Sequence, residues 1–102
     1  MFEIANIAAA LNQLYHSEFG GKSYGRYYLT LEQMKKLSGR ENMNKSTESK
    51  IAAQAEKEHG LLVTRVGRGQ TRGFAVIQAT KVIGWRPPSR AAIAKAIREN
   101  CQ

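Results

Sequence analysis

Apolar residues recur every three or four positions near the start of the chain. Isoleucine and leucine at positions 4, 7, 11 and 14 fall on one stripe of a helix. This spacing predicts a helix over residues 2–19, which Gly20 and Gly21 would end. The following segment, residues 22–29, mixes tyrosine with glycine and favours a short strand.

Two further helices are expected, with a polar turn between them. Thr30 can cap the first, because Gln33 lies three residues later and completes a capping box, and this helix should end at residue 38. The second should begin near residues 44–46 and run to residue 59. Gly60 can then end it in a left-handed conformation.

β-Branched and aromatic residues dominate two later segments, residues 61–66 and 74–83. The sequence between them, GRGQTRG, contains enough glycine to reverse the chain direction. These segments predict a β-hairpin with a basic tip.

A last helix is expected over residues 90–100, after Trp85 and two prolines close the sheet region. Ser89 can cap this helix. Its apolar side is made of Ala92, Ile93, Ala96 and Ile97.

The expected order of helix, strand, helix, turn, helix, strand, wing and strand resembles the winged helix-turn-helix domain. Residues 24–29 correspond to its first strand, residues 30–38 and 46–59 to its pair of helices, and residues 61–83 to its winged hairpin. The resemblance implies an α+β fold in a single domain, to which residues 90–100 are added. It also implies that the second helix of the pair enters the major groove of DNA and that the wing touches the flanking backbone or minor groove.

The chain is strongly basic, with 16 Lys and Arg against 8 acidic residues and a formal net charge of +8. All the acidic residues are Glu. From Gly60 onward eight cations are accompanied by a single acidic residue, Glu99, so the second half carries +7 of the net charge. This imbalance points to a polyanionic partner.

The helix that begins near Ser46 has one arc without glutamate, although Glu56 borders it. Gln54 on this arc can bind an adenine edge, and Lys50 can reach guanine or phosphate. The alternative is a solvated helix face that contacts nothing. The expected DNA-contacting residues of this helix are Lys45, Ser46, Thr47, Ser49, Lys50, Gln54 and Lys57.

The hairpin turn concentrates arginine. Arg65, Arg68 and Arg72 surround a flexible tip that can follow a phosphate backbone or enter a narrow minor groove. We expect no carboxylate beside them, so they would repel one another in the free protein. This favours a bound anion over a merely solubilising turn, and Gln70 and Thr71 complete the expected DNA-binding set.

Aromatic residues offer a second kind of contact. Trp85 could stack on a base, but its position between Ile83 and Pro87 favours a core or lid residue. Tyrosines 24, 27 and 28 beside Arg26 could form a stacking platform for single strands. Strand alternation instead favours at least one ring in the core.

The sequence does not predict an enzyme. GGKS at residues 20–23 resembles the end of a nucleotide-binding Walker loop, but the first required glycine would fall at His16. The chain lacks aspartate, and His16 and His59 have no partners at metal-ligand spacing. We therefore expect no catalytic site, no cofactor and no metal.

Cysteine and apolar content bear on location. Cys101 is the only cysteine, which excludes an intramolecular disulfide and fits a reducing cytoplasm. The longest apolar-looking stretch, residues 4–14, is too short to cross a membrane, and the N-terminus lacks the positive start of a secretory signal. A membrane association is not expected.

These patterns predict a sequence-specific double-stranded DNA-binding protein, a small transcriptional repressor or accessory factor. The main alternative is a winged-helix interaction module or inhibitor that binds an acidic protein. RNA binding is a minor alternative, because the aromatic sheet motifs of the RRM and the GXXG loop of KH domains are missing.

A homodimer that reads two half-sites is also expected, because the stripe at positions 4, 7, 11 and 14 is close to a heptad seam. The first and last helices would form its interface. If these helices instead bury each other within the monomer, binding must come from the basic face.

Overall fold

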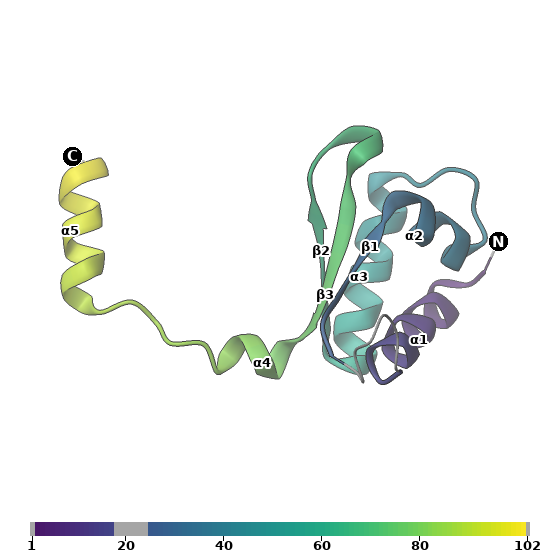
Figure 1. The fold of residues 1–102 in the computed structure, drawn as a ribbon, viewed down its shortest axis with the longest axis horizontal. Helices are drawn as coiled ribbons and strands as arrows, with labels where there is room; N and C mark the ends of the chain where they lie inside the picture. The colour runs from purple at the N-terminus through teal and green to yellow at the C-terminus, as the bar shows by residue number, and fades with distance from the viewer. Residues whose placement is uncertain (1, 18–24, 102) are drawn as a thin grey trace.

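The computed structural model describes residues 2–17 and 25–101 of the chain. Its architecture is α+β, as expected, and its order of elements is compatible with a winged-helix layout (Figure 1). A short 3₁₀ turn, Gly69–Thr71, lies between β2 and β3. The helices and strands are α1 (Ile4–Tyr15), β1 (Tyr27–Thr30), α2 (Leu31–Ser38), α3 (Lys45–His59), β2 (Leu61–Val66), β3 (Gly73–Gln78), α4 (Ala79–Ile83) and α5 (Arg90–Asn100).

Local capping defines the two central helices where the sequence predicts them. The Thr30 hydroxyl accepts a hydrogen bond from the Gln33 amide at 3.2 Å, and the Gln33 side chain accepts one from the Thr30 amide at 2.9 Å. The Asn44 side chain caps α3 by accepting from the Thr47 amide at 2.8 Å. Gly60 ends α3 in the left-handed conformation, with φ of 64°.

The N-terminal helix and the first strand are shorter than expected. Within the described residues α1 ends at Tyr15 and β1 begins at Tyr27. Gly20, Gly21 and Tyr24, to which the sequence assigns the helix end and the strand start, lie outside the described residues.

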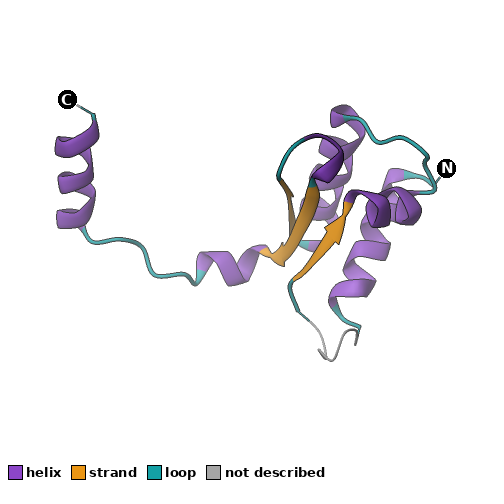
Figure 2. Cartoon of the chain, turned by 45° about the horizontal axis from the view of Figure 1, so that its top comes forward, coloured by secondary structure: helices purple, strands orange, loops and turns teal. Residues whose placement is uncertain are grey.

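The three strands form an antiparallel sheet in the order β1-β3-β2 (Figure 2). Leu61, Phe74 and Val76 are buried on the face that packs against the helices. Because side chains alternate along a strand, residues one position away from these point to the opposite face. The helices cover one face of the sheet only (Figure 1).

The expected strand over residues 74–83 is wrong in its second half. β3 ends at Gln78, which pairs with Leu61, the first residue of β2. β1 reaches only as far as Val76 on its side of β3. With no strand neighbour beyond this point, the Ala79 amide donates to the Gly60 carbonyl at 2.8 Å and the chain turns into α4.

The apolar stripe of α1 lies inside the monomer rather than at a dimer seam. Ile7 and Leu11, with Ala8 and Tyr15, are buried in the core, where α1 packs against α3. The argument that this stripe pairs with a second subunit is therefore wrong, because its side chains already contact α3 and the sheet.

The chain after α4 extends away from the body of the molecule, which consists of α1, α2, α3 and the sheet (Figure 1). Ser89 caps α5 as expected, accepting from the Ala92 amide at 3.1 Å, but every residue from 83 to 101 is exposed. The first and last helices thus do not bury each other. The Cα radius of gyration is 16.5 Å, and the molecule measures 49 × 30 × 27 Å.

Trp85 is 63% exposed, so its expected role as a core or lid residue is wrong. It lies beyond α4, on the segment that leaves the body, where few neighbours can cover it. Across the described ranges of the chain, no helix combines the length and apolar content needed to span a membrane.

Candidate nucleic-acid interface

The outward face of α3 is exposed as the sequence predicts. Its exposed residues are Lys45, Ser46, Ser49, Lys50, Ala53 and Lys57. Thr47 and Gln54 are partly buried, while Ile51 and Ala55 on the other side belong to the core. Glu56 and Glu58 are also exposed, so the N-terminal half of this face is the more basic.

The wing tip, residues 67–72, joins β2 to β3. Arg68, Gln70 and Thr71 are exposed there, and the Thr71 hydroxyl donates to the Arg68 carbonyl at 3.0 Å. Gly67 and Gly69 have φ of 87° and 61°, which side chains other than glycine rarely adopt. The short 3₁₀ turn and these glycines define the shape of the tip.

The expectation that no carboxylate lies beside the arginines is wrong. Glu48, whose side chain is only 6% exposed, forms ion pairs with Arg65 and Arg72, each at 3.0 Å. The Arg72 Nε also donates to Glu48 Oε1 at 3.2 Å. One carboxylate thus faces two guanidinium groups, which reduces the repulsion between Arg65 and Arg72 and leaves a single positive charge on the three side chains.

Arg72 is held by more than this carboxylate. Its Nη2 donates to the Met43 carbonyl at 2.9 Å and its Nη1 to the Gly69 carbonyl at 2.6 Å. The side chain is 11% exposed. Arg72 thus joins the α2–α3 turn, the first turn of α3 and the wing tip, and cannot donate freely to a ligand.

Arg65 is more open than Arg72, with 36% of its side chain exposed. It borders a groove of about 250 Å³ between α3 and β2, which is also lined by Lys45, Ser49 and Ala52 of α3. The groove brings two expected DNA-contacting residues of the helix next to one of the hairpin.

Sequence reasoning missed Glu48 as the partner because 17 and 24 residues separate it from the two arginines. One signal was present. Glu48 precedes Ile51 and Ala55 at three and seven positions, so it lies on the buried stripe of the helix. A carboxylate on such a stripe requires a buried cation or hydrogen-bond donors.

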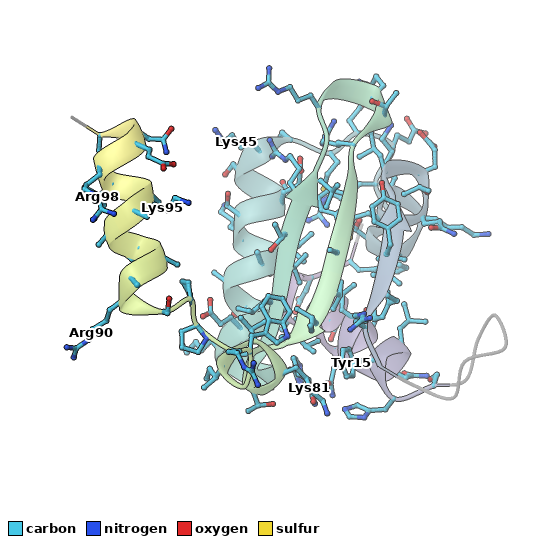
Figure 3. All side chains as sticks on the ribbon, turned by 60° about the vertical axis from the view of Figure 1, so that its left-hand side comes forward. Tyr15, Lys45, Lys81, Arg90, Lys95 and Arg98 are labelled. Atoms are coloured by element: carbon cyan, nitrogen blue, oxygen red, sulfur yellow. The ribbon has the colours of Figure 1, made fainter. Side chains whose placement is uncertain are left out.

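The other cations lie elsewhere. Lys45 is at the same end of the molecule as the wing tip, whereas Lys81 is at the opposite end (Figure 3). Arg90, Lys95 and Arg98 lie on α5, apart from the body (Figure 3). They do not extend the basic surface of α3 in this conformation.

The tyrosines divide as strand alternation predicts. Tyr27 faces the core, where its hydroxyl donates to the Leu11 carbonyl at 2.7 Å, and burial raises its pKa. Tyr28 is exposed on the other face of the sheet. Trp85 lines a hollow of about 550 Å³ with His16, Arg26 and Lys81, at the end of the sheet away from the wing tip.

No group of three or more His, Cys, Asp or Glu side chains that could hold a metal ion occurs in the part of the chain that the structure describes. Comparison with known protein families, curated proteins and solved structures found no match. The likeness to a winged helix therefore rests on the order and pairing of elements alone.

Proposed function

We propose that this chain binds double-stranded DNA in the manner of a winged helix, with α3 in the major groove and the wing tip on the flanking backbone. The observation that carries this proposal is the exposed Lys and Ser face of α3 beside a wing that Glu48 ties to the first turn of the same helix. The order of elements and the net charge of +8 support it.

The ion pairs of Glu48 give the two contact elements a fixed relative position. Arg65 and Arg72 are on the hairpin and Glu48 is on α3. The carboxylate therefore holds the β2–β3 hairpin against the first turn of the helix. An interface whose parts are already in place loses less conformational entropy on binding. Arg72 is therefore a positioning residue rather than a contact to phosphate.

The contacts divide by chemistry. Lys45, Lys50, Lys57 and Arg68 are exposed cations suited to phosphate. Ser46 and Ser49 can donate to phosphate near the helix start. Gln54, partly buried at the base of this face, can read an adenine edge and give sequence preference. Four phosphate contacts predict a slope of log K against log salt of about −3.6.

The biological role that fits such binding is regulation of transcription at a specific site, as a repressor or accessory factor. An acidic protein partner would meet the same cations, so it is the competing proposal for this surface. Salt dependence alone does not separate DNA binding from binding of an acidic protein. A preference for duplex DNA over single-stranded DNA and RNA does separate them.

The test is fluorescence anisotropy with duplex DNA, single-stranded DNA and RNA between roughly 50 and 300 mM salt. We expect duplex DNA to bind most tightly and to lose affinity steeply with salt. Lys50→Ala and Arg68→Ala should each lower the slope by about 1. Lys81→Ala removes the same charge at the far end of the sheet and should leave binding unchanged.

Absence of binding to all three nucleic acids at the lowest salt would overturn the proposal and favour an acidic protein partner. A preference for RNA or single strands would place the contacts elsewhere, since α3 is suited to the major groove of a DNA duplex. Equal losses in Lys81→Ala and Lys50→Ala would refute the assignment of the contact surface.

A further inference from the structure

The outer sheet face, opposite the helices, is mainly apolar in the strands that the structure describes, and Arg26, just before β1, lies at its edge. Strand alternation and the pairing register place eight strand residues on it: Tyr28, Thr30, Leu62, Thr64, Val66, Gly73, Ala75 and Ile77. Tyr28 and Val66 are about half exposed, and the other apolar residues are partly buried. In an antiparallel sheet with one face in water, the side chains on that face are usually polar.

This apolar surface continues beyond the strands. A groove of about 500 Å³ has one charged lining residue, Arg26; its other lining residues are Tyr27, Tyr28, Ala75, Val76, Ile77 and Trp85. Ile83, at the end of α4, is 80% exposed. Apolar side chains that gather along one exposed groove mark an interaction site on a soluble protein.

An uncovered helix of the same chain has the complementary surface. Ile93 and Ile97 lie one turn apart on α5, each about half exposed, and Ala92 and Ala96 flank them. Lys95 lies on the opposite side of the helix and Arg98 on its flank, whereas Arg90, three and seven residues before the two isoleucines, lies at the N-terminal end of their stripe. Because α5 has only 11 residues, it needs packing against an apolar partner to be stable.

The segment that leads to α5 directs it away from its own sheet. Residues 84–89 include Pro87 and Pro88, and proline-rich segments remain extended at about 3.1 Å per residue. Figures 1 and 2 show α5 standing apart from the body at the end of this segment. Docking on a different copy requires no reversal of this linker.

We propose that α5 of a second copy of this chain covers the outer sheet face, and that the two copies exchange their helices reciprocally. Ile93 and Ile97 would enter the groove beside Trp85, and Lys95, on the opposite side of α5, would remain in solvent. Twofold symmetry makes the contact twice, which doubles the apolar area buried in the dimer. The expected homodimer thus uses the last helix but not the first.

This proposal does not depend on DNA binding. The outer sheet face and α3 are on opposite sides of the sheet, so a dimer formed in this way leaves the face of α3 open. Loss of dimerisation and loss of DNA binding are separate observations on separate variants.

Sedimentation equilibrium of the full chain tests the proposal. We expect a dimer, whose dissociation constant Ile97→Glu raises about 100-fold by placing a carboxylate against the apolar side chains of the groove. Ala91→Glu adds the same group to the opposite side of α5 and should leave the dimer intact. Trp85→Ala removes the groove wall from the accepting copy and should raise the constant about 10-fold.

Folding of the variants is checked by circular dichroism and thermal melting, which should change little because residues 83–101 lie outside the core. Hydrogen exchange should show α5 protected in the parent dimer and unprotected in Ile97→Glu. A parent protein that stays monomeric, with α5 protected or not, overturns the proposal. A dimer that Ile97→Glu leaves as tight as before overturns it as well.

Discussion

Glu48 of α3 forms the ion pairs that join this helix to the β2–β3 hairpin. Its side chain is 6% exposed and bonded to two guanidinium groups. Removing one partner of a buried ion pair leaves the other charge desolvated without compensation. Glu48→Ala should therefore lower the free energy of unfolding by about 3 kcal/mol, as measured by urea denaturation.

Glu56→Ala is the matched control, because Glu56 is exposed on the same helix. It should change stability by less than about 0.5 kcal/mol. Glu48→Gln, which keeps an acceptor but loses the charge, should fall between the two. Equal stability of all three variants would mean that the pairs of Glu48 contribute nothing to the fold.

Tyr27 gives the fold a sensitivity to alkaline pH. Burial raises the pKa of its hydroxyl above the ordinary value of about 10. Because the folded state holds this proton more tightly, its contribution is complete below about pH 10 and is lost as pH rises through the folded pKa. Tyr27→Phe should therefore flatten the loss of stability above pH 10.

At pH 7 the same variant should cost about 1 kcal/mol, because the bond to the Leu11 carbonyl is lost. Chemical denaturation at pH 7 and at several values above pH 10 measures both effects. Tyr28→Phe is the control: it leaves Tyr27 in place and should keep the alkaline loss of the parent. A Tyr27→Phe variant with an unchanged alkaline profile would contradict this role.

At the scale of elements, the β1–β3 pairing depends on a glycine. A Cβ on Gly73 would lie 2.0 Å from the Tyr28 hydroxyl oxygen and 2.7 Å from the Leu29 carbonyl oxygen. The tyrosine ring can move, but the carbonyl belongs to the paired strand. Gly73→Ala should therefore destabilise the protein by about 2 kcal/mol in thermal or urea unfolding.

Gly84→Ala is the corresponding control, because a Cβ there would lie 3.6 Å from the nearest backbone atom, the Lys81 carbonyl oxygen. Its φ of −78° suits any residue, so the substitution should be neutral or slightly stabilising. If Gly73→Ala were as stable as Gly84→Ala, β1 would not pack against β3 as closely as the register requires.

Elements with local signals could be predicted from the sequence, and those that depend on a tertiary neighbour could not. The capping box at Thr30 and the glycine at position 60 act within a few residues. The sequence therefore predicts the start of α2 and the end of α3 closely. Residues 79–83 have strand-like composition, yet they form α4 because the neighbouring strands end first. Propensity does not reveal where a partner strand stops.

The same distinction applies to the candidate interface. The exposed face of α3 follows from helical periodicity, which is a local property. The ion pairs of Arg65 and Arg72 depend on a carboxylate brought close only by the fold. The sequence alone therefore predicts a contact role for both arginines, whereas in the structure Arg68 is the exposed arginine of the wing tip.

At the scale of the whole molecule, the chain is more extended than a compact domain of its length. A compact chain of this length has a radius of gyration of about 13 Å, whereas the Cα value here is 16.5 Å. The difference comes from α5 and the segment before it, which lie outside the body (Figure 1). Reciprocal exchange of α5 would place each helix on a body, so two extended chains would form one compact dimer.

Salt should act in opposite directions on the two proposed interactions. Each copy carries a formal charge of +8, so two copies repel each other, and salt screens this repulsion. The contact between α5 and the outer sheet face is mainly apolar, and screening would also weaken the repulsion between Arg90 of one copy and Arg26 of the other. Dimerisation should therefore hold or tighten between roughly 50 and 300 mM salt, while DNA affinity falls with a slope of about −3 to −4.

Sedimentation equilibrium and anisotropy in the same buffers measure the two trends on one preparation. Ile97→Glu should abolish the first trend, and its monomer should still bind a single half-site, because α3 and the wing tip are unchanged. A dimer that dissociates as salt rises would instead be held by charge, for example by Glu56 or Glu58 of one copy against cations of the other. That result would move the dimer contact from the outer sheet face to α3 and would make dimerisation compete with DNA.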